Sequence, residues 1–148
     1  MSSTPSQAQR EACDRMIDRH FRFEADDDVD GVLGTLAEDV EHEIVGAPSG
    51  PLRGREAARG FYRALFADLS GEKVTSVRRY YGEHFVVDES LWEGHATGAP
   101  FGIPGHGRRL AFRLLHLFDL APDGRIAREQ VWLDHAAIVR QLQEPPAA

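Results

Sequence analysis

Cysteine is nearly absent from the sequence, since Cys13 is the single one among 148 residues. One cysteine cannot form an internal disulfide, and its isolation excludes CxxC redox motifs and cysteine-based zinc sites. The chain also has no run of Lys or Arg, and its formal net charge is -7. Nucleic acid is therefore not an expected partner, because clustered basic side chains bind phosphate backbones.

Long apolar segments are absent as well. No stretch approaches the roughly 20 apolar residues of a membrane-spanning helix. The N-terminal sequence MSSTPSQAQREACDR is polar and lacks the apolar core of a signal peptide. We therefore expect a cytoplasmic protein without a membrane partner. Hydrophobic residues make up 42% and charged residues 28%, as in a soluble protein of one domain. We place this domain at residues 6–143, with flexible tails at 1–5 and 144–148.

Apolar spacing divides the chain into helices and strands. Helical periodicity predicts a long helix over residues 6–25, a short one over 29–36 capped by Asp28, a third over 55–69, and a last one over 136–142 after Asp134. Strands are expected over residues 40–46, 73–82, 83–94, 109–120 and 125–133. Helices first and a strand meander afterwards indicate an α+β fold, with a curved sheet that carries helices on one face.

The last two expected strands form a hairpin that holds a titratable group on each arm. Residues 121–124, APDG, have the Pro and Gly of a type I turn. Pairing across this turn places His116 directly opposite Glu129 on an otherwise apolar face, whereas a one-residue bulge would place Gln130 there. The two side chains form either a structural ion pair in a core or a catalytic pair in a pocket.

The opposite face of this hairpin mixes apolar and polar side chains. These are Arg113, Leu115, Leu117, Arg128, Gln130 and Trp132. Such a face suits a subunit interface, although a partly solvated surface would have a similar composition.

Several motifs in the second half of the chain resemble one known family. They are Gly94 and Gly98, GIP at 102–104, GR at 107–108, DGRI at 123–126, Glu129, Asp134, and QL at 141–142. The pattern is similar to that of SnoaL-like polyketide cyclases and ester cyclases, within the nuclear-transport-factor-like and ketosteroid-isomerase-like superfamily. LAEDVEHEIVG and PLRGREAARGFYRALF in the first half are similar to this family too.

The resemblance implies a cone, in which a strongly curved sheet wraps around three helices of the N-terminal half and encloses a pocket. It also implies homodimers through the convex sheet face, and an intramolecular aldol closure that needs no cofactor and no metal. The family's acid–base aspartate lies on the last strand near a histidine of the preceding strand. His116 falls on that histidine position, but Val131 falls on the aspartate position, two residues after Glu129.

Further candidates for the pocket come from the same periodicity. His42 shares a face of the first strand with Val40 and Ile44, so it can meet a substrate carbonyl or bond a backbone group. The candidate substrate-contacting residues are Trp92, Tyr62, Phe61, His20, Phe112 and Val131. Each of the aromatic side chains also suits a core, and His20 also suits the surface of its helix.

Three functions remain open from the sequence. The first is an enzyme that uses cofactor-independent acid–base chemistry in an apolar pocket, with Glu129 and His116 as the working pair and His42 as a third polar group. The second is a non-catalytic protein that binds a small hydrophobic molecule. The third is a dimeric scaffold with a closed pocket, which a cavity well below roughly 300 Å³ would favour.

Overall fold

The structure is a computed structural model that describes residues 4–145. Residues 1–3 and 146–148, parts of the expected tails, lie outside the described residues. The elements are α1 (Gln7–Ala25), α2 (Val29–Gly34), β1 (Leu36–Ile44), β2 (Leu52–Arg53), α3 (Arg55–Asp68), β3 (Ser70–Tyr81), β4 (Phe85–Ala96), the 3₁₀ turn η1 (Pro100–Gly102), β5 (Arg108–Leu120), β6 (Ile126–Leu133) and α4 (His135–Gln143). No helix in this part of the chain is long and apolar enough to span a membrane.

Side-chain caps fix where the helices begin. The Ser6 hydroxyl accepts from the backbone N–H of Gln9, and the Gln9 side chain accepts from the N–H of Ser6. Asp28 caps α2 and Asp134 caps α4, as expected from the sequence. Each cap satisfies a backbone N–H that has no partner inside its helix.

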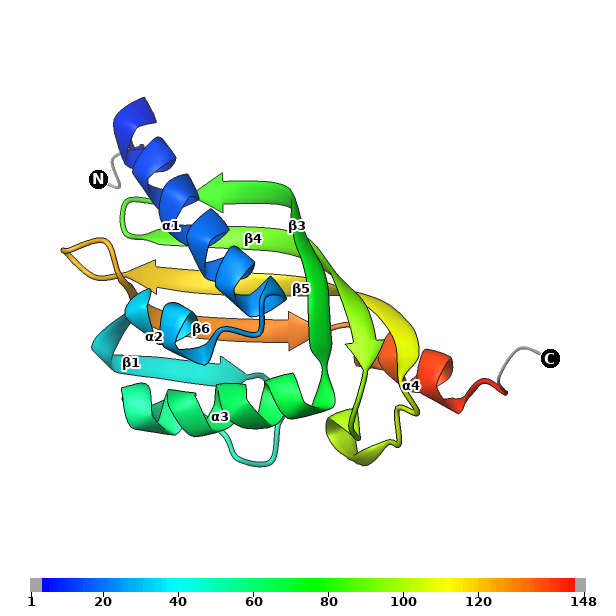
Figure 1. The fold of residues 1–148 in the computed structure, drawn as a ribbon. Coiled ribbons are helices and arrows are strands. Elements are labelled where there is room, and N and C mark those ends of the chain that lie inside the picture. The colour runs from blue at the N-terminus through cyan, green and yellow to red at the C-terminus, as the bar shows by residue number, and fades with distance from the viewer. Residues whose placement is uncertain (1–3, 146–148) are drawn as a thin grey trace.

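One six-stranded sheet in the order β2-β1-β6-β5-β4-β3 forms the frame of the molecule (Figure 1). Neighbouring strands are antiparallel, except that β1 runs parallel to β6. The four strands of the expected meander are β3 to β6. The parallel contact joins the first strand to the last and sets His42 beside Glu129.

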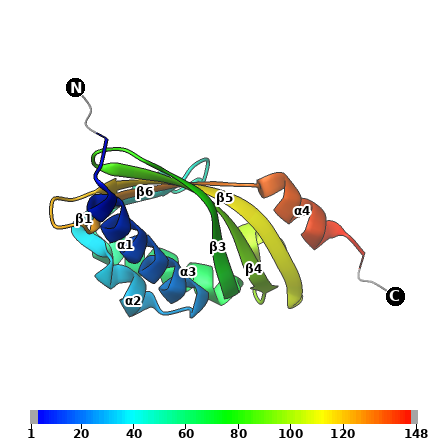
Figure 2. The same cartoon turned by 90° about the horizontal axis from the view of Figure 1, so that it is seen from above.

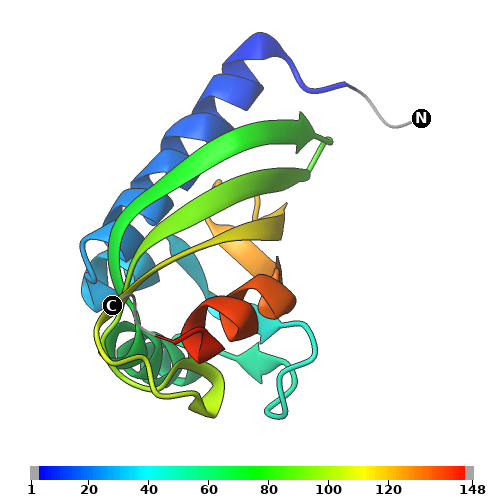
Figure 3. The same cartoon turned by 90° about the vertical axis from the view of Figure 1, so that its right-hand side faces the viewer.

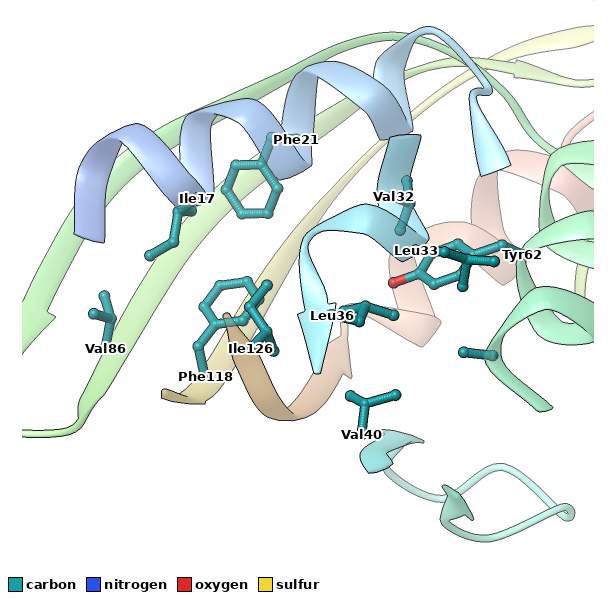
Figure 4. Packing of buried hydrophobic residues seen from close by; sticks show 11 residues of the cluster. Ile17, Phe21, Val32, Leu33, Leu36, Val40, Tyr62, Val86, Phe118 and Ile126 are labelled. Carbon is teal, nitrogen blue, oxygen red and sulfur yellow. The ribbon is translucent and has the colours of Figure 1, made fainter. Parts of the chain in front are cut away.

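Helices α1, α2 and α3 all lie on one side of the sheet, which curves around them (Figures 2 and 3). This is the α+β cone expected from the sequence. A buried apolar cluster joins α1 and α2 to the sheet, and Tyr62 extends into it from α3 (Figure 4). Helix α4 packs against the far end of β5.

The expected register of the β5–β6 hairpin is wrong by two residues. His116 lies opposite Val131, and Glu129 lies opposite Phe118. The turn itself forms, because the N–H of Gly124 donates to the carbonyl of Ala121 at 2.9 Å. The pairing shifts by one residue at Gly124, which has a φ of 86°, and by one more between Asp119 and Leu120. A total shift of two residues keeps each side chain on its original face, so His116 and Glu129 still point to the same side.

Gly94, the first glycine of the motif, lies in β4 at a position where the packing leaves no room for a side chain. A Cβ atom on Gly94 would lie 2.2 Å from the carbonyl oxygen of Ser70 and 2.6 Å from the Trp92 ring. We expect Gly94→Ala to lower the free energy of unfolding by about 3 kcal/mol, because neither neighbour can move freely. Gly60→Ala is the matched control, since Gly60 lies in α3 with nothing within 4 Å, and it should stabilise by about 1 kcal/mol. Urea denaturation of both variants tests this, and equal effects would contradict it.

Candidate active site

An apolar cavity with a volume of about 90 Å³ lies between the concave face of the sheet and helix α3. It is bounded by all but one of the residues predicted for the site, namely His42, Phe61, Tyr62, Trp92, Phe112, His116, Glu129 and Val131. His20 is the exception, because it is fully buried behind Glu129 and does not line the cavity. The fold therefore gathers residues from β1, α3, β4, β5 and β6 at one place.

Glu129 is the polar centre of this cavity, although only 1% of the residue is exposed. Its Oε1 lies 3.3 Å from Nε2 of His20 on α1. Its Oε2 accepts a hydrogen bond from the Tyr62 hydroxyl at 3.1 Å and lies 3.8 Å from Nε2 of His42. A carboxylate in an apolar interior needs such partners, since burial without them costs several kcal/mol.

His20 carries a positive charge that two carboxylates share. The Thr35 hydroxyl donates to the carbonyl of Val32, so it must accept the bond that joins it to Nδ1 of His20 at 2.7 Å. Nε2 faces Glu24 at 3.2 Å and Glu129 at 3.3 Å, so it too must carry a proton. Burial disfavours this charge, but the two carboxylates outweigh burial and raise the pKa of His20 to about 10.

The charge on His20 keeps Glu129 ionised. Burial alone would raise the pKa of Glu129, but the nearby His20 imidazolium and its hydrogen bond hold that pKa well below its usual range. Burial, together with the charge of Glu129, raises the pKa of Tyr62 well above 10, so its hydroxyl remains a hydrogen-bond donor.

His42 is the neutral partner of Glu129 on the cavity side. Burial lowers its pKa, although Glu129 opposes the shift. Its Nε2 lies 3.8 Å from Oε2 of Glu129, and that nearby carboxylate favours a ring proton on Nε2. Nδ1 is buried and has no hydrogen-bond partner among the described residues. His42 lines the cavity, so we propose this nitrogen as the acceptor of a proton or a hydrogen bond from a molecule that enters there.

His116 has a different carboxylate partner from the one predicted. Asp88 lies directly opposite it on β4, with Oδ1 at 3.9 Å from Nδ1 of His116, and the Ser90 hydroxyl lies 3.3 Å from the same nitrogen. The other oxygen of Asp88 accepts from Nε of Arg79 at 2.8 Å. Burial among Phe21 and Phe118 lowers the pKa of His116, so its ring is neutral at pH 7.

Comparison with known proteins assigns this architecture to a family. The model of the SnoaL-like polyketide cyclases matches residues 13–142. The chain belongs to the SnoaL-like polyketide cyclase family. No curated protein matches it in sequence.

Solved structures with the same fold come from several bacteria. A protein from Jannaschia sp. CCS1 described as a SnoaL-like polyketide cyclase is 20% identical, with a TM-score of 0.81 over 97% of this chain and 99% of that one. TsrD from Streptomyces laurentii is 20% identical, with a TM-score of 0.77 over 95% and 98%. An epoxide hydrolase of the LEH-like kind from M. tuberculosis is 19% identical, with a TM-score of 0.70 over 89% and 90%.

The register explains how this SnoaL-like protein departs from the expected site. Val131 lies directly opposite His116, so the position that the resemblance assigns to an acid–base aspartate is apolar here. Two other carboxylates face the histidines instead, Glu129 beside His42 and Asp88 beside His116. The two histidines that line the cavity therefore have different carboxylate neighbours, and His20 shares Glu129 with His42.

Three acidic residues near the cavity are not among the predicted site residues. Glu24 and Asp27 line the cavity, and Asp88 lies behind His116. Glu24 follows His20 by four residues on α1, so helical spacing alone could have paired the two. Asp88 could have been found only from the pairing of β4 with β5, because no local pattern relates it to His116.

Among the described residues, His20, Glu24 and Glu129 form the one group whose potential metal-ligating atoms all lie within 4.8 Å of one another. A nitrogen and two carboxylates suit a divalent cation such as Zn²⁺ or Mn²⁺. With both nitrogens protonated, however, the His20 ring already supplies the positive charge between the two carboxylates.

Removing the charge of Asp88 should affect both the fold and His116. Asp88 is fully buried and forms an ion pair with Arg79, so we expect Asp88→Asn to lower the free energy of unfolding by about 3 kcal/mol. The pKa of His116 should fall further, because the Asp88 charge favours the imidazolium. Denaturation and NMR titration of the His116 ring measure the two effects. A rise in that pKa would contradict the pairing.

Proposed function

We propose that the chain is a small-molecule enzyme that moves a proton at a carbon next to a carbonyl group, without a cofactor. The observation that carries this proposal is Glu129, an ionised carboxylate buried at an apolar cavity between a charged histidine and a neutral one. Titratable groups with strongly shifted pKa values in an apolar cavity are typical of acid–base catalysts.

His42 is the base in this proposal. Its free Nδ1 takes the proton from the substrate carbon, and the electron pair of the C–H bond moves toward the carbonyl oxygen to give an enolate. The carboxylate of Glu129 stabilises the resulting His42 imidazolium, much as a carboxylate supports the histidine of a catalytic triad. The enolate then regains a proton at another carbon or attacks an electrophilic carbon of the same molecule, which gives isomerase or cyclase chemistry.

The cavity limits the size of the reacting part. Its volume of about 90 Å³ lies below the roughly 300–1,000 Å³ of sites for drug-sized ligands. A dry cavity of about 150 Å³ is enough to bind benzene. The substrate is therefore a molecule of a few heavy atoms, or a longer one of which only the reacting end enters.

Proton exchange tests this proposal before the natural substrate is identified. The protein is incubated in D₂O with a panel of small ketones and 1,3-dicarbonyl compounds, and ¹H NMR follows the loss of the C–H signals next to each carbonyl. We expect at least one compound to exchange faster than in buffer and in the presence of the His42→Gln variant. No acceleration for any compound would count against catalysis.

The small cavity also favours a second candidate, a non-catalytic binder or scaffold on the same fold. A pure scaffold would, however, leave Nδ1 of His42 buried without a partner for no benefit, and such a group costs about 1–3 kcal/mol. Compounds that bind in the cavity but show no exchange of their C–H protons would support the non-catalytic binding protein.

The convex face of the sheet suits a homodimer. Leu115 and Trp132 are direct partners across β5 and β6, point away from the cavity and are 41% and 40% exposed. We propose that a second copy of the chain covers them, since exposed aromatic and aliphatic pairs are typical of interface cores. Light scattering should find a dimer for the native chain and a monomer for Trp132→Glu. A monomeric native protein would contradict this.

A further inference from the structure

The cavity has more acidic side chains than positive charges. Glu24, Asp27 and Glu129 all line it, and none of the described lining residues is Lys or Arg. The His20 imidazolium is shared by Glu24 and Glu129 and neutralises one of the two charges. A net negative charge therefore remains inside walls that are otherwise apolar, where charge–charge attraction is stronger than in water.

The fold holds part of this charge at the end of α1, where Glu24 and Asp27 line the cavity. Asp27 has a φ of 54°, and its carboxylate accepts from the Ser70 hydroxyl at 3.1 Å and the Gly71 N–H at 3.2 Å. Glu24 and Asp27 flank the C-terminus of α1, where the helix dipole adds further negative potential. The carboxylate of Asp27 is thus fixed in place by a backbone and a side-chain hydrogen bond.

Aromatic rings form much of the rest of the wall. Phe61, Phe66 and Phe101 line one part, and Trp92 stacks on Phe112 with the ring centres 5.0 Å apart. The faces of such rings attract cations, and aromatic walls combined with carboxylates bind quaternary ammonium groups. A neutral hydrophobic ligand would use the rings but would gain nothing from the carboxylates.

A polar anchor for the same ligand lies within the cavity. His42 is 2% exposed, and its unpartnered Nδ1 is a hydrogen-bond acceptor because Nε2 faces Glu129. A ligand with a hydroxyl or an acidic C–H near its cationic group would satisfy this nitrogen.

We infer that the cavity selects a small organic cation, a protonated or quaternary amine with a polar group a few bonds away. This inference names the substrate class of the site in the proposed function and uses the same cavity, but it concerns binding only. If cation binding fails, acid–base catalysis on a neutral substrate is not contradicted. If catalysis fails, cation binding is not contradicted.

The test compares choline with 3,3-dimethylbutan-1-ol, which has the same shape and hydroxyl group but a carbon in place of the charged nitrogen. NMR titration of the purified protein measures both dissociation constants. We expect choline to bind at least about tenfold more tightly, from the ring faces and carboxylates together. Added salt should weaken choline binding and leave the alcohol unaffected.

Single substitutions identify the residues that cause the preference for choline. Glu24→Gln, Asp27→Asn and Phe66→Leu should each weaken choline binding severalfold and change alcohol binding little. Glu38→Gln is the control, because Glu38 is exposed and lies outside the cavity. Equal affinity for the two compounds, no binding of choline, or an equal loss in Glu38→Gln and Glu24→Gln would overturn the inference.

Discussion

Glu129→Gln is expected to slow proton exchange at the substrate carbon by about 10²–10⁴-fold, the range of a lost acid–base partner. Glutamine has the shape of glutamate, and its amide can still bond to Tyr62 and His20. The variant should therefore fold, while the His42 imidazolium that forms during the reaction loses the negative charge that stabilises it. Exchange rates in D₂O measured for the native and variant proteins check this expectation.

Glu43→Gln is the matched control for that comparison. Glu43 lies on β1 next to His42 but points to the other face of the sheet, where it accepts from the side chain of Gln130 at 3.0 Å. Exchange should be unchanged in this variant. An active Glu129→Gln protein, with a dichroism spectrum like that of the native chain, would show that the buried carboxylate has a structural role only.

The stability of the protein should peak near pH 6.5 and fall on both sides. The pKa of His20 is raised from 6.5 to about 10, so its contribution is complete below pH 6.5 and is lost as the pH rises through 10. The pKa values of His42 and His116 are lowered, so the unfolded chain takes up more protons than the folded one below pH 6.5. Glu129 adds to the loss of stability at low pH, because its stabilising contribution disappears as the carboxylate becomes protonated.

The fall in stability above pH 6.5 is due to His20. One linked proton gives a slope of about 1.4 kcal/mol per pH unit, so the free energy of unfolding should fall at about that rate between pH 7 and 9. His20→Gln should be less stable at pH 6.5 and nearly flat over this range. His84→Gln should keep the native slope, since the His84 side chain is 81% exposed. Urea denaturation at several pH values measures the three profiles, and a flat native profile would contradict a buried imidazolium.

The elements and faces of this protein could be predicted from its sequence because they depend on local patterns. Alternation on the first strand put His42 on the same face as Val40, and both are buried. His116 and Glu129 stayed on one face although the register was wrong, because the error was an even number of residues. The register itself depends on the backbone at Gly124 and on the shift after Asp119, which a turn motif alone does not reveal.

The polar partners could not be predicted because they come from distant parts of the chain. His20 meets Glu129 across 109 positions, and Tyr62 meets it across 67. The parallel pairing of β1 with β6 brings His42 to the same carboxylate. Sequence periodicity indicates which side of an element is buried, but not which element covers it. For that reason Asp88, and not Glu129, turned out to face His116.

The protonation states of the buried histidines test the proposed site most directly. Long-range ¹H–¹⁵N NMR of protein labelled in its 7 histidines distinguishes charged rings from neutral ones, and the His20→Gln, His42→Gln and His116→Gln variants assign the signals. At pH 8 we expect both ring nitrogens of His20 to carry protons, while the rings of His42 and His116 are neutral. A neutral His20, or a charged His42, at that pH would contradict the arrangement of one carboxylate between a charged histidine and a free base.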